Sequence, residues 1–421
     1  MLAAGAIALA LSAIVLVLGQ GLREAALAPW VILGAGVVLD LMMSRVPRKD
    51  VSVEIPPEMF VGETEDFVFD IAPISKGMTG KVDWPEGLSG PDSIKFADAG
   101  LTKVPVRAVR RGSWQVTRLH LIWSSRFKLF ERVPTLALAL DVKVVPNIRL
   151  VQSGQITSVV LSNMFGMKEN RAVGEGTEFH QLRDFVTGMD VKSIDWKRSA
   201  RHRNLVSREL RAERNHHVII ALDNGYLMRE EIAGLLKIDH AVTAALATAW
   251  AAALGGDMVG FYAYDTRPNI FVAPKPGRAA FPALRLRTSE LDYVSLETNH
   301  TLAMTELNAR TPKRSLIIIF SDFVDTTTAE LMVENISVLS KRHAVIFVIM
   351  RDPELENLTE NAPTDMDQVA ELVAAGQTLN ERQLVLGRLA ALGVTIVDAK
   401  PGTVTAQLIS TYLDIKAREV I

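Results

Sequence analysis

The chain has 421 residues, a formal net charge of -2 and no cysteine. This length exceeds one ordinary hydrophobic core, so two or three globular units are expected. The small net charge argues against a nucleic-acid binder, whose affinity would depend on neutralising phosphates. The lack of cysteine excludes disulfides, thiolate nucleophiles and cysteine metal sites.

Residues 1–46 predict a transmembrane helical hairpin. Leu2 to Leu18 carry no charge over 17 residues, a length of about 26 Å as a helix, and a second apolar stretch runs from about Ala25 to Met43. The short sequence GQGLRE separates them. A cleaved signal peptide is the alternative for the first stretch, but the basic region that opens such a peptide is missing.

Basic residues indicate the orientation of this hairpin. Arg45, Arg48 and Lys49 follow the second stretch, whereas Arg23 stands alone between the two. Positive residues stay on the cytoplasmic side, so we expect a multi-pass protein of the inner membrane with its remaining domains in the cytoplasm. Asp40 lies inside the second stretch, and its carboxylate is expected to reach water or to pair with Arg45.

Residues 51–146 predict an all-β sandwich. In LALALDVKVVP the apolar side chains recur at every second position and share one face: Leu136, Leu138, Leu140, Val142 and Val144. Turn-rich segments such as WPEGLSGPDS separate the short strands. This composition is typical of a sandwich of two antiparallel sheets.

Residues 147–215 form a charged segment that we expect to pack on the following domain, and residues 216–421 predict an α/β domain. Short apolar strands (HVIIALD, MVGFYAYD, SLIIIFSD, HAVIFVIM, VTIVDA) alternate with stretches of helical spacing. This alternation predicts a Rossmann-like parallel sheet covered by helices on both faces. Ligand sites in such folds lie at the carboxyl ends of the strands, where Asp223 and Asp322 stand.

Three oxygen-bearing residues are the candidate metal ligands. Asp223 and Asp322 each end a strand, and Thr298 precedes a predicted helix. Here the sequence resembles a von Willebrand factor A domain, whose metal site uses Asp-x-Ser-x-Ser, a distant Thr and a later Asp. Gly225 and Leu227 stand at the two serine positions, so two hydroxyl ligands are missing. The open alternatives are a weak Mg²⁺ site and a vestigial site whose aspartates cap turns and helices.

The charged segment carries a second resemblance. GTEFHQLRDFVTGMDVKSIDWKRSARHRNLVSRELRAER at residues 176–214, followed by LDNGYLM, is similar to the signature of the bacterial membrane-protein family catalogued as domain of unknown function 58. The resemblance implies a partner more than a reaction, because members are often encoded beside MoxR-type AAA+ ATPases. It therefore implies such an ATPase as partner.

Two surfaces are candidates for docking that partner. In the charged segment, Trp196 and Arg208 either belong to an internal salt-bridged clasp or face a partner. At the strand ends, Tyr226 and Asp325 either stabilise their own turns or receive basic residues.

The expected function is that of a non-catalytic adaptor or scaffold, acting with the ATPase in protein assembly or chaperoning, without a cofactor. A Walker A loop, a His-Glu-x-x-His motif and a Gly-x-Ser-x-Gly elbow are all missing from the sequence. The alternative is a metal-dependent enzyme or ligand-binding protein that uses Asp223 and Asp322. A nucleic-acid binder is disfavoured, since acids interleave with the arginines.

Overall fold

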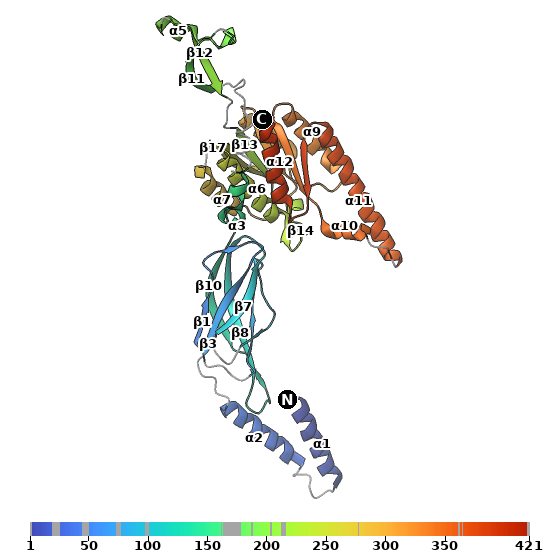
Figure 1. The fold of residues 1–421 in the computed structure, drawn as a ribbon. Coiled ribbons are helices and arrows are strands. Elements are labelled where there is room, and N and C mark those ends of the chain that lie inside the picture. Colours follow the sequence, from blue (N-terminus) through green and yellow to red (C-terminus); the bar gives the residue numbers. More distant parts are fainter. Residues whose placement is uncertain are drawn as a thin grey trace. The chain divides into compact units, whose positions relative to one another are not determined.

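The computed structural model describes residues 2–18, 26–43, 50–72, 77–96, 101–160, 162, 178–186, 188–202, 204–211, 216–276, 278–360, 363 and 365–418. The chain divides into two compact units, Met1–Val145 and Pro146–Ile421. In Figure 1 the first unit runs from blue to cyan and the second from green to red. The sequence predicted four segments, with a boundary after residue 146.

Two helices begin the first unit, α1 (Leu2–Leu18) and α2 (Ala28–Met43). The prediction of two transmembrane helices is wrong: in the part of the chain that the structure describes, no helix is long and apolar enough to cross a membrane. The helices have 17 and 16 residues. At 1.5 Å per residue they reach about 26 and about 24 Å, short of the roughly 30 Å of a hydrocarbon core.

Asp40 joins α2 to the β-rich part of the same unit. Its side chain is fully buried, and its carboxylate accepts hydrogen bonds from Ser125 Oγ at 2.6 Å and from the Phe127 amide at 3.1 Å. The Arg132 guanidinium donates to the Leu41 carbonyl at 3.2 Å. The carboxylate thus meets a turn of the β structure; Arg45, the predicted partner, lies outside the described residues.

Two sheets build the rest of the first unit. One has the order β1-β3-β7-β5, and the other β2-β10-β8-β4-β6, with β9 paired to β8. The strands are β1 (Asp50–Glu54), β2 (Met59–Phe60), β3 (Thr64–Ala72), β4 (Thr79–Val82), β5 (Leu88–Ser89), β6 (Ile94–Lys95), β7 (Leu101–Ala108), β8 (Gly112–Ser124), β9 (Glu131–Arg132) and β10 (Thr135–Val145). The apolar alternation predicted for β10 is present, because Leu136, Val142 and Val144 are more buried than their neighbours Ala137 and Lys143.

The second unit begins with short elements and then alternates strands with helices. The first are α3 (Arg149–Gln152), β11 (Glu178–Asp184), η2 (Val191–Ser193), α5 (Trp196–His202) and β12 (Val206–Arg211). The later strands are β13 (His217–Asp223), β14 (Glu231–Ile232), β15 (Leu235–Leu236), β16 (Met258–Tyr264), β17 (Pro268–Pro276), β18 (Leu316–Phe320), β19 (Ala344–Met350) and β20 (Thr395–Ala399). The helices among them are η3 (Tyr226–Arg229), α6 (Lys237–Leu254), η4 (Arg278–Ala280), α7 (Phe281–Ser289), α8 (His300–Arg310), α9 (Thr328–Ser340), α10 (Pro353–Glu360), α11 (Met366–Ala391) and α12 (Val404–Ala417).

A six-stranded sheet organises this unit, in the order β17-β16-β13-β18-β19-β20. Counted in chain order the strands read 3-2-1-4-5-6, the order of doubly wound α/β folds. All pairs are parallel except β16 with β17. The strand order reverses between β13 and β18, so the carboxyl ends of these two strands form the topological switch point.

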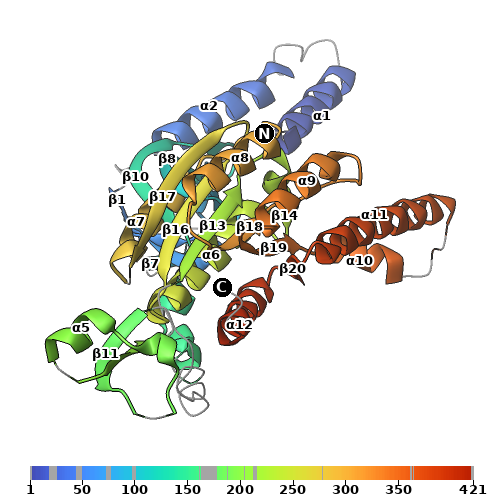
Figure 2. The same cartoon turned by 90° about the horizontal axis from the view of Figure 1, so that it is seen from above.

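Successive side chains of a strand point to opposite faces of the sheet, so a hydrophobic core forms on each face. One face buries Ile219 and Ala221 of β13 and Ile317 and Ile319 of β18, against α8, α9 and α11. On the other face α6 contacts β13, β16, α7 and α12. Figure 2 shows these helices on opposite sides of the sheet. Strands buried on both faces are apolar along their centre, as residues 218–222 of β13 are, so the buried Asp223 at the end of this strand needs polar partners.

The outer strand β17 carries prolines at Pro268, Pro274 and Pro276. It pairs with β16 on one side and is the last strand of the sheet on the other. Proline has no amide hydrogen, so it suits an edge strand and not a central one.

Candidate functional site

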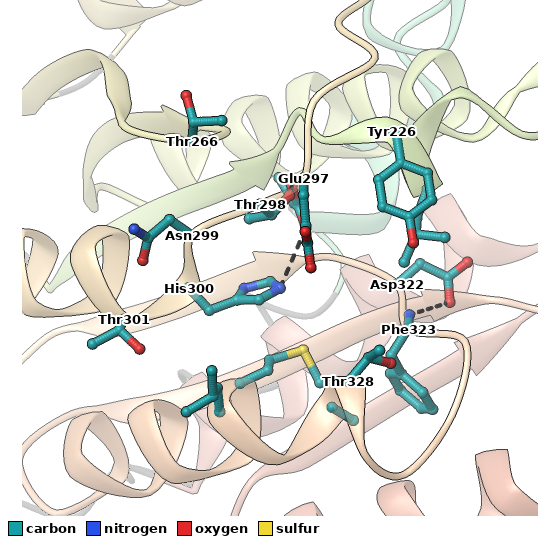
Figure 3. A pocket seen from close by; sticks show the side chains of 15 residues that line it. Tyr226, Thr266, Glu297, Thr298, Asn299, His300, Thr301, Asp322, Phe323 and Thr328 are labelled. Atoms are coloured by element: carbon teal, nitrogen blue, oxygen red, sulfur yellow. Dashed lines mark hydrogen bonds and ion pairs between the residues drawn. The ribbon is translucent and has the colours of Figure 1, made fainter.

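The strand ends at the switch point line a pocket of about 510 Å³. It lies among the ends of β13 and β18, the segment before α8, and the first turn of α9 (Figure 3). All three candidate metal ligands line it: Asp223, Thr298 and Asp322. Pockets at the switch point are where doubly wound folds bind ligands, so this is the candidate site.

Asp223 is held by hydrogen bonds from three different loops. Its Oδ1 accepts from Thr298 Oγ1 at 2.6 Å and from the Gly225 amide at 2.9 Å. Its Oδ2 accepts from Ser321 Oγ at 2.6 Å. Only 2% of the residue is exposed. These donors stabilise the buried carboxylate and fix the loops after β13 and β18 and before α8 to one another.

Gly225 is required by this arrangement. A Cβ built on Gly225 would lie 1.9 Å from Thr298 Oγ1 and 3.2 Å from Asp223 Oδ1. Any larger residue must therefore displace Thr298. Gly225 stands where the resembled metal motif has a serine ligand. Its lack of a side chain leaves room for the hydrogen bond from Thr298 to Asp223.

Asp322 has a different partner, the buried ammonium group of Lys237. Lys237 Nζ lies 2.5 Å from Asp322 Oδ2 and also contacts a Glu230 carboxylate oxygen. The Phe323 amide donates to Asp322 Oδ1 at 2.8 Å. Burial by itself lowers the pKa of Lys237, but the charges of Asp322 and Glu230 outweigh it and raise the pKa above 10.5. Lys237 is therefore protonated at neutral pH. Burial raises the pKa of Asp322, although the charge and hydrogen bond of Lys237 act to lower it.

His300 lies beside Asp223 at the start of α8. Its Nε2 is 3.9 Å from Asp223 Oδ2, and its ring meets Tyr264 edge-on with centroids 6.1 Å apart. Burial lowers the pKa of His300 below its ordinary value of 6.5, although Asp223 and Glu297 act to raise it. His300 is therefore a neutral imidazole at neutral pH.

The residues at this site do not fit a divalent cation. Asp322 already has the Lys237 ammonium as its cation, and Asp223 accepts hydrogen bonds on both oxygens. Gly225 leaves no room for a side-chain ligand. Among the described residues, no group of three or more His, Asp or Glu side chains is placed to hold a metal ion.

The predicted docking residues at the strand ends differ in their surroundings. Tyr226 lines the pocket and is 44% exposed. Glu297, which the sequence analysis did not select, is exposed and lines the same pocket. Asp325 instead accepts a hydrogen bond of 2.7 Å from the Thr328 amide at the start of α9. The hydrogen bonds from Thr328 lower the pKa of Asp325.

The other predicted docking residues lie on the charged segment. Trp196 begins α5 and is 64% exposed, and Arg208 is exposed on β12, opposite Leu182 of β11. Neither lines the strand-end pocket. The two candidate surfaces are thus separate sets of residues, and docking at either stays a prediction.

Sequence reasoning did not find Lys237, Ser321 or His300. Ser321 directly precedes Asp322 and His300 lies two residues after Thr298, so their positions in sequence were an available signal. Lys237 is 85 residues from Asp322 along the chain. An available signal was a lysine directly before the stretch of helical spacing that begins at Ile238, because a cation at the amino end of a helix is unfavourable unless a carboxylate compensates it.

The strand order defines a doubly wound α/β domain. The loops around its switch-point pocket are held together by hydrogen bonds to Asp223 and by the buried pair of Lys237 and Asp322. Residues 181–371 match the model of a family described as "Protein of unknown function DUF58". A search of curated proteins gives no match.

Three solved structures are similar to part of the chain, each over 48% of this chain and 99% of its own length. The conserved hypothetical protein BatB from Bacteroides thetaiotaomicron has 14% identity and a TM-score of 0.31. An aerotolerance-related membrane protein from Bacteroides fragilis has 15% identity and a TM-score of 0.29. An uncharacterized membrane spanning protein from Vibrio fischeri has 14% identity and a TM-score of 0.17.

Proposed function

We propose that this protein is a non-catalytic adaptor or scaffold that binds a partner protein at the strand-end pocket of its α/β unit. The observation that carries the proposal is the state of the pocket's carboxylates. Asp223 and Asp322 are buried, and their carboxylates are already engaged by hydrogen bonds and an ion pair within the protein, which supports a role in structure over one as base, nucleophile or metal ligand. The exposed groups at the rim remain available for contact.

The rim favours a partner with a basic segment. Tyr226 offers an exposed aromatic ring beside the exposed carboxylate of Glu297, both on the pocket wall. Aromatic anchors flanked by charged groups are common where proteins bind one another. An arginine or lysine side chain could enter the pocket and approach Glu297 while its apolar stem covers Tyr226.

The proposed partner is a MoxR-type AAA+ ATPase, with assembly or chaperoning of other proteins as the joint task. The support is the resemblance of residues 176–214 to the family signature, and the match of residues 181–371 to the DUF58 model is consistent with it. The predicted inner-membrane location has lost the support of the two apolar spans, and the binding role does not require it.

Capture of the ATPase tests this proposal. Wild-type protein should retain the ATPase in a pull-down, and Glu297→Lys or Tyr226→Ala should each reduce retention about tenfold or more, the effect of losing one interface residue worth at least roughly 1.4 kcal/mol. Glu371→Lys is the matched control, since it makes the same charge change at an exposed position of α11. Unchanged capture by both pocket variants, with folding intact, would exclude this face as the docking site.

A further inference from the structure

Lys237 occupies a position that is unfavourable for a cation on general grounds. It is the first residue of α6 and only 7% exposed. The amino end of a helix carries partial positive charge, and burial removes the water that would stabilise an ammonium group. A lysine at this place therefore needs carboxylates in direct contact.

The local fold supplies those carboxylates. The hairpin of β14 and β15 turns at Ala233 and Gly234, which both have positive φ, and returns the chain so that the Lys237 amide donates to the Glu230 carbonyl at 2.9 Å. The same approach puts the Lys237 ammonium group against the Glu230 carboxylate, and Asp322 meets it from the end of β18. One cation thus joins the loops that follow β13 and β18.

This is the task a divalent cation would perform at the strand ends of the resembled fold. We infer that the Lys237 ammonium group is a tethered cation that replaces the metal ion at this edge of the sheet, so that the pocket stays assembled in the absence of divalent cations. Because the cation is part of the chain, it is present at the site whatever the metal concentration. This inference goes beyond the proposed function and does not depend on it.

The test is a titration of the purified full chain with Mn²⁺ and Mg²⁺, followed by calorimetry and by thermal unfolding. Wild-type protein should bind neither ion at the pocket and should keep its Tm. Lys237→Met removes the charge at similar side-chain length and leaves Asp322 and Glu230 without their cation. Its Tm should fall, and Mn²⁺ should bind and raise it again.

Two further variants make the result specific. Lys237→Met with Asp322→Asn removes both members of the pair, so it should be more stable than Lys237→Met alone and should not bind Mn²⁺. Lys416→Met is the matched control: Lys416 Nζ lies 2.8 Å from the buried Asp257, and its side chain is 10% exposed. Its Tm should also fall, but Mn²⁺ should not restore it.

Two outcomes would overturn the inference. One is Mn²⁺ or Mg²⁺ binding by wild-type protein that Asp322→Asn abolishes, a measurement that stays decisive even if Lys237→Met does not fold. The other is the absence of specific Mn²⁺ binding by the variant: either a folded Lys237→Met protein does not bind Mn²⁺, or the control Lys416→Met protein binds Mn²⁺ equally well.

Discussion

At the scale of single residues, Gly225 replaces a serine of the resembled metal motif and leaves space for Thr298 in the pocket. The missing hydroxyl could be read from the sequence, but the close approach of Thr298 could not, because 73 positions separate the two residues and the loops between them decide the contact. The contact makes Gly225 a steric requirement of the pocket.

We expect Gly225→Ala to lower the free energy of unfolding by about 1–3 kcal/mol, the typical effect of overpacking a filled site. The added Cβ would collide with Thr298 Oγ1 at 1.9 Å. Thr298→Ala removes that oxygen, so the glycine substitution should be less harmful in that background. Denaturant unfolding of the two single variants and the double variant measures the coupling. Additive effects would contradict this explanation.

His300 should make the stability of the protein depend on pH. Its pKa in the folded protein is below 6.5, the ordinary value that applies to the unfolded chain. Between those two pKa values the unfolded chain binds more protons. The contribution of His300 is therefore complete above about pH 6.5 and is lost as the pH falls through the folded pKa.

Unfolding by denaturant at about pH 5 and about pH 8 measures this loss, which His300→Gln should reduce. A second histidine needs a parallel variant, because burial and the charges of Arg342 and Arg314 also lower the pKa of His343. His343→Gln provides that comparison. Equal pH dependence in wild type and His300→Gln would show that His300 does not contribute.

At the scale of elements, α12 is fastened to the loop that precedes β16. The buried carboxylate of Asp257 accepts a hydrogen bond of 2.5 Å from the Tyr412 hydroxyl and lies 2.8 Å from Lys416 Nζ. Lys416 also donates to the Gly255 carbonyl. The last helix of the chain is therefore held by a buried charged pair as well as by its apolar contacts with α6.

Asp257→Ala should destabilise the second unit by about 3–5 kcal/mol, because it leaves the Lys416 ammonium buried without its carboxylate. Hydrogen exchange should show α12 opening more readily than β13 and β18. Lys416→Met with Asp257→Ala should recover part of the loss. A loss below about 1 kcal/mol for Asp257→Ala would mean that the pair contributes no more than an exposed one.

The strands were the elements whose positions were most predictable, because a buried strand of a parallel sheet has a continuous apolar sequence. HVIIALD and SLIIIFSD predicted β13 and β18, and with them the placement of Asp223 and Asp322 at one edge. The charge of that edge was not predictable, since it depends on which helix end brings Lys237 against Asp322. Pairings between distant loops are set by tertiary packing, which periodicity does not encode.

At the scale of the whole molecule, composition predicted more than one folded unit but misjudged the N-terminal helices. Apolar character along residues 2–18 and 28–43 was clear, whereas the length of the helices that form there was not. The buried contact of Asp40 with Ser125 was also outside the reach of sequence reasoning, because 85 residues separate the two. Local patterns predict elements well and their long-range polar contacts poorly.

The prolines of β17 give the two margins of the large sheet different capacities for self-association. A second copy that tried to extend the sheet beyond β17 would meet Pro268, Pro274 and Pro276, which cannot donate the hydrogen bonds of a growing ladder. Strand addition at this margin is therefore disfavoured by the prolines. The opposite margin, β20, has no proline, so a strand from another chain would meet no such obstacle there.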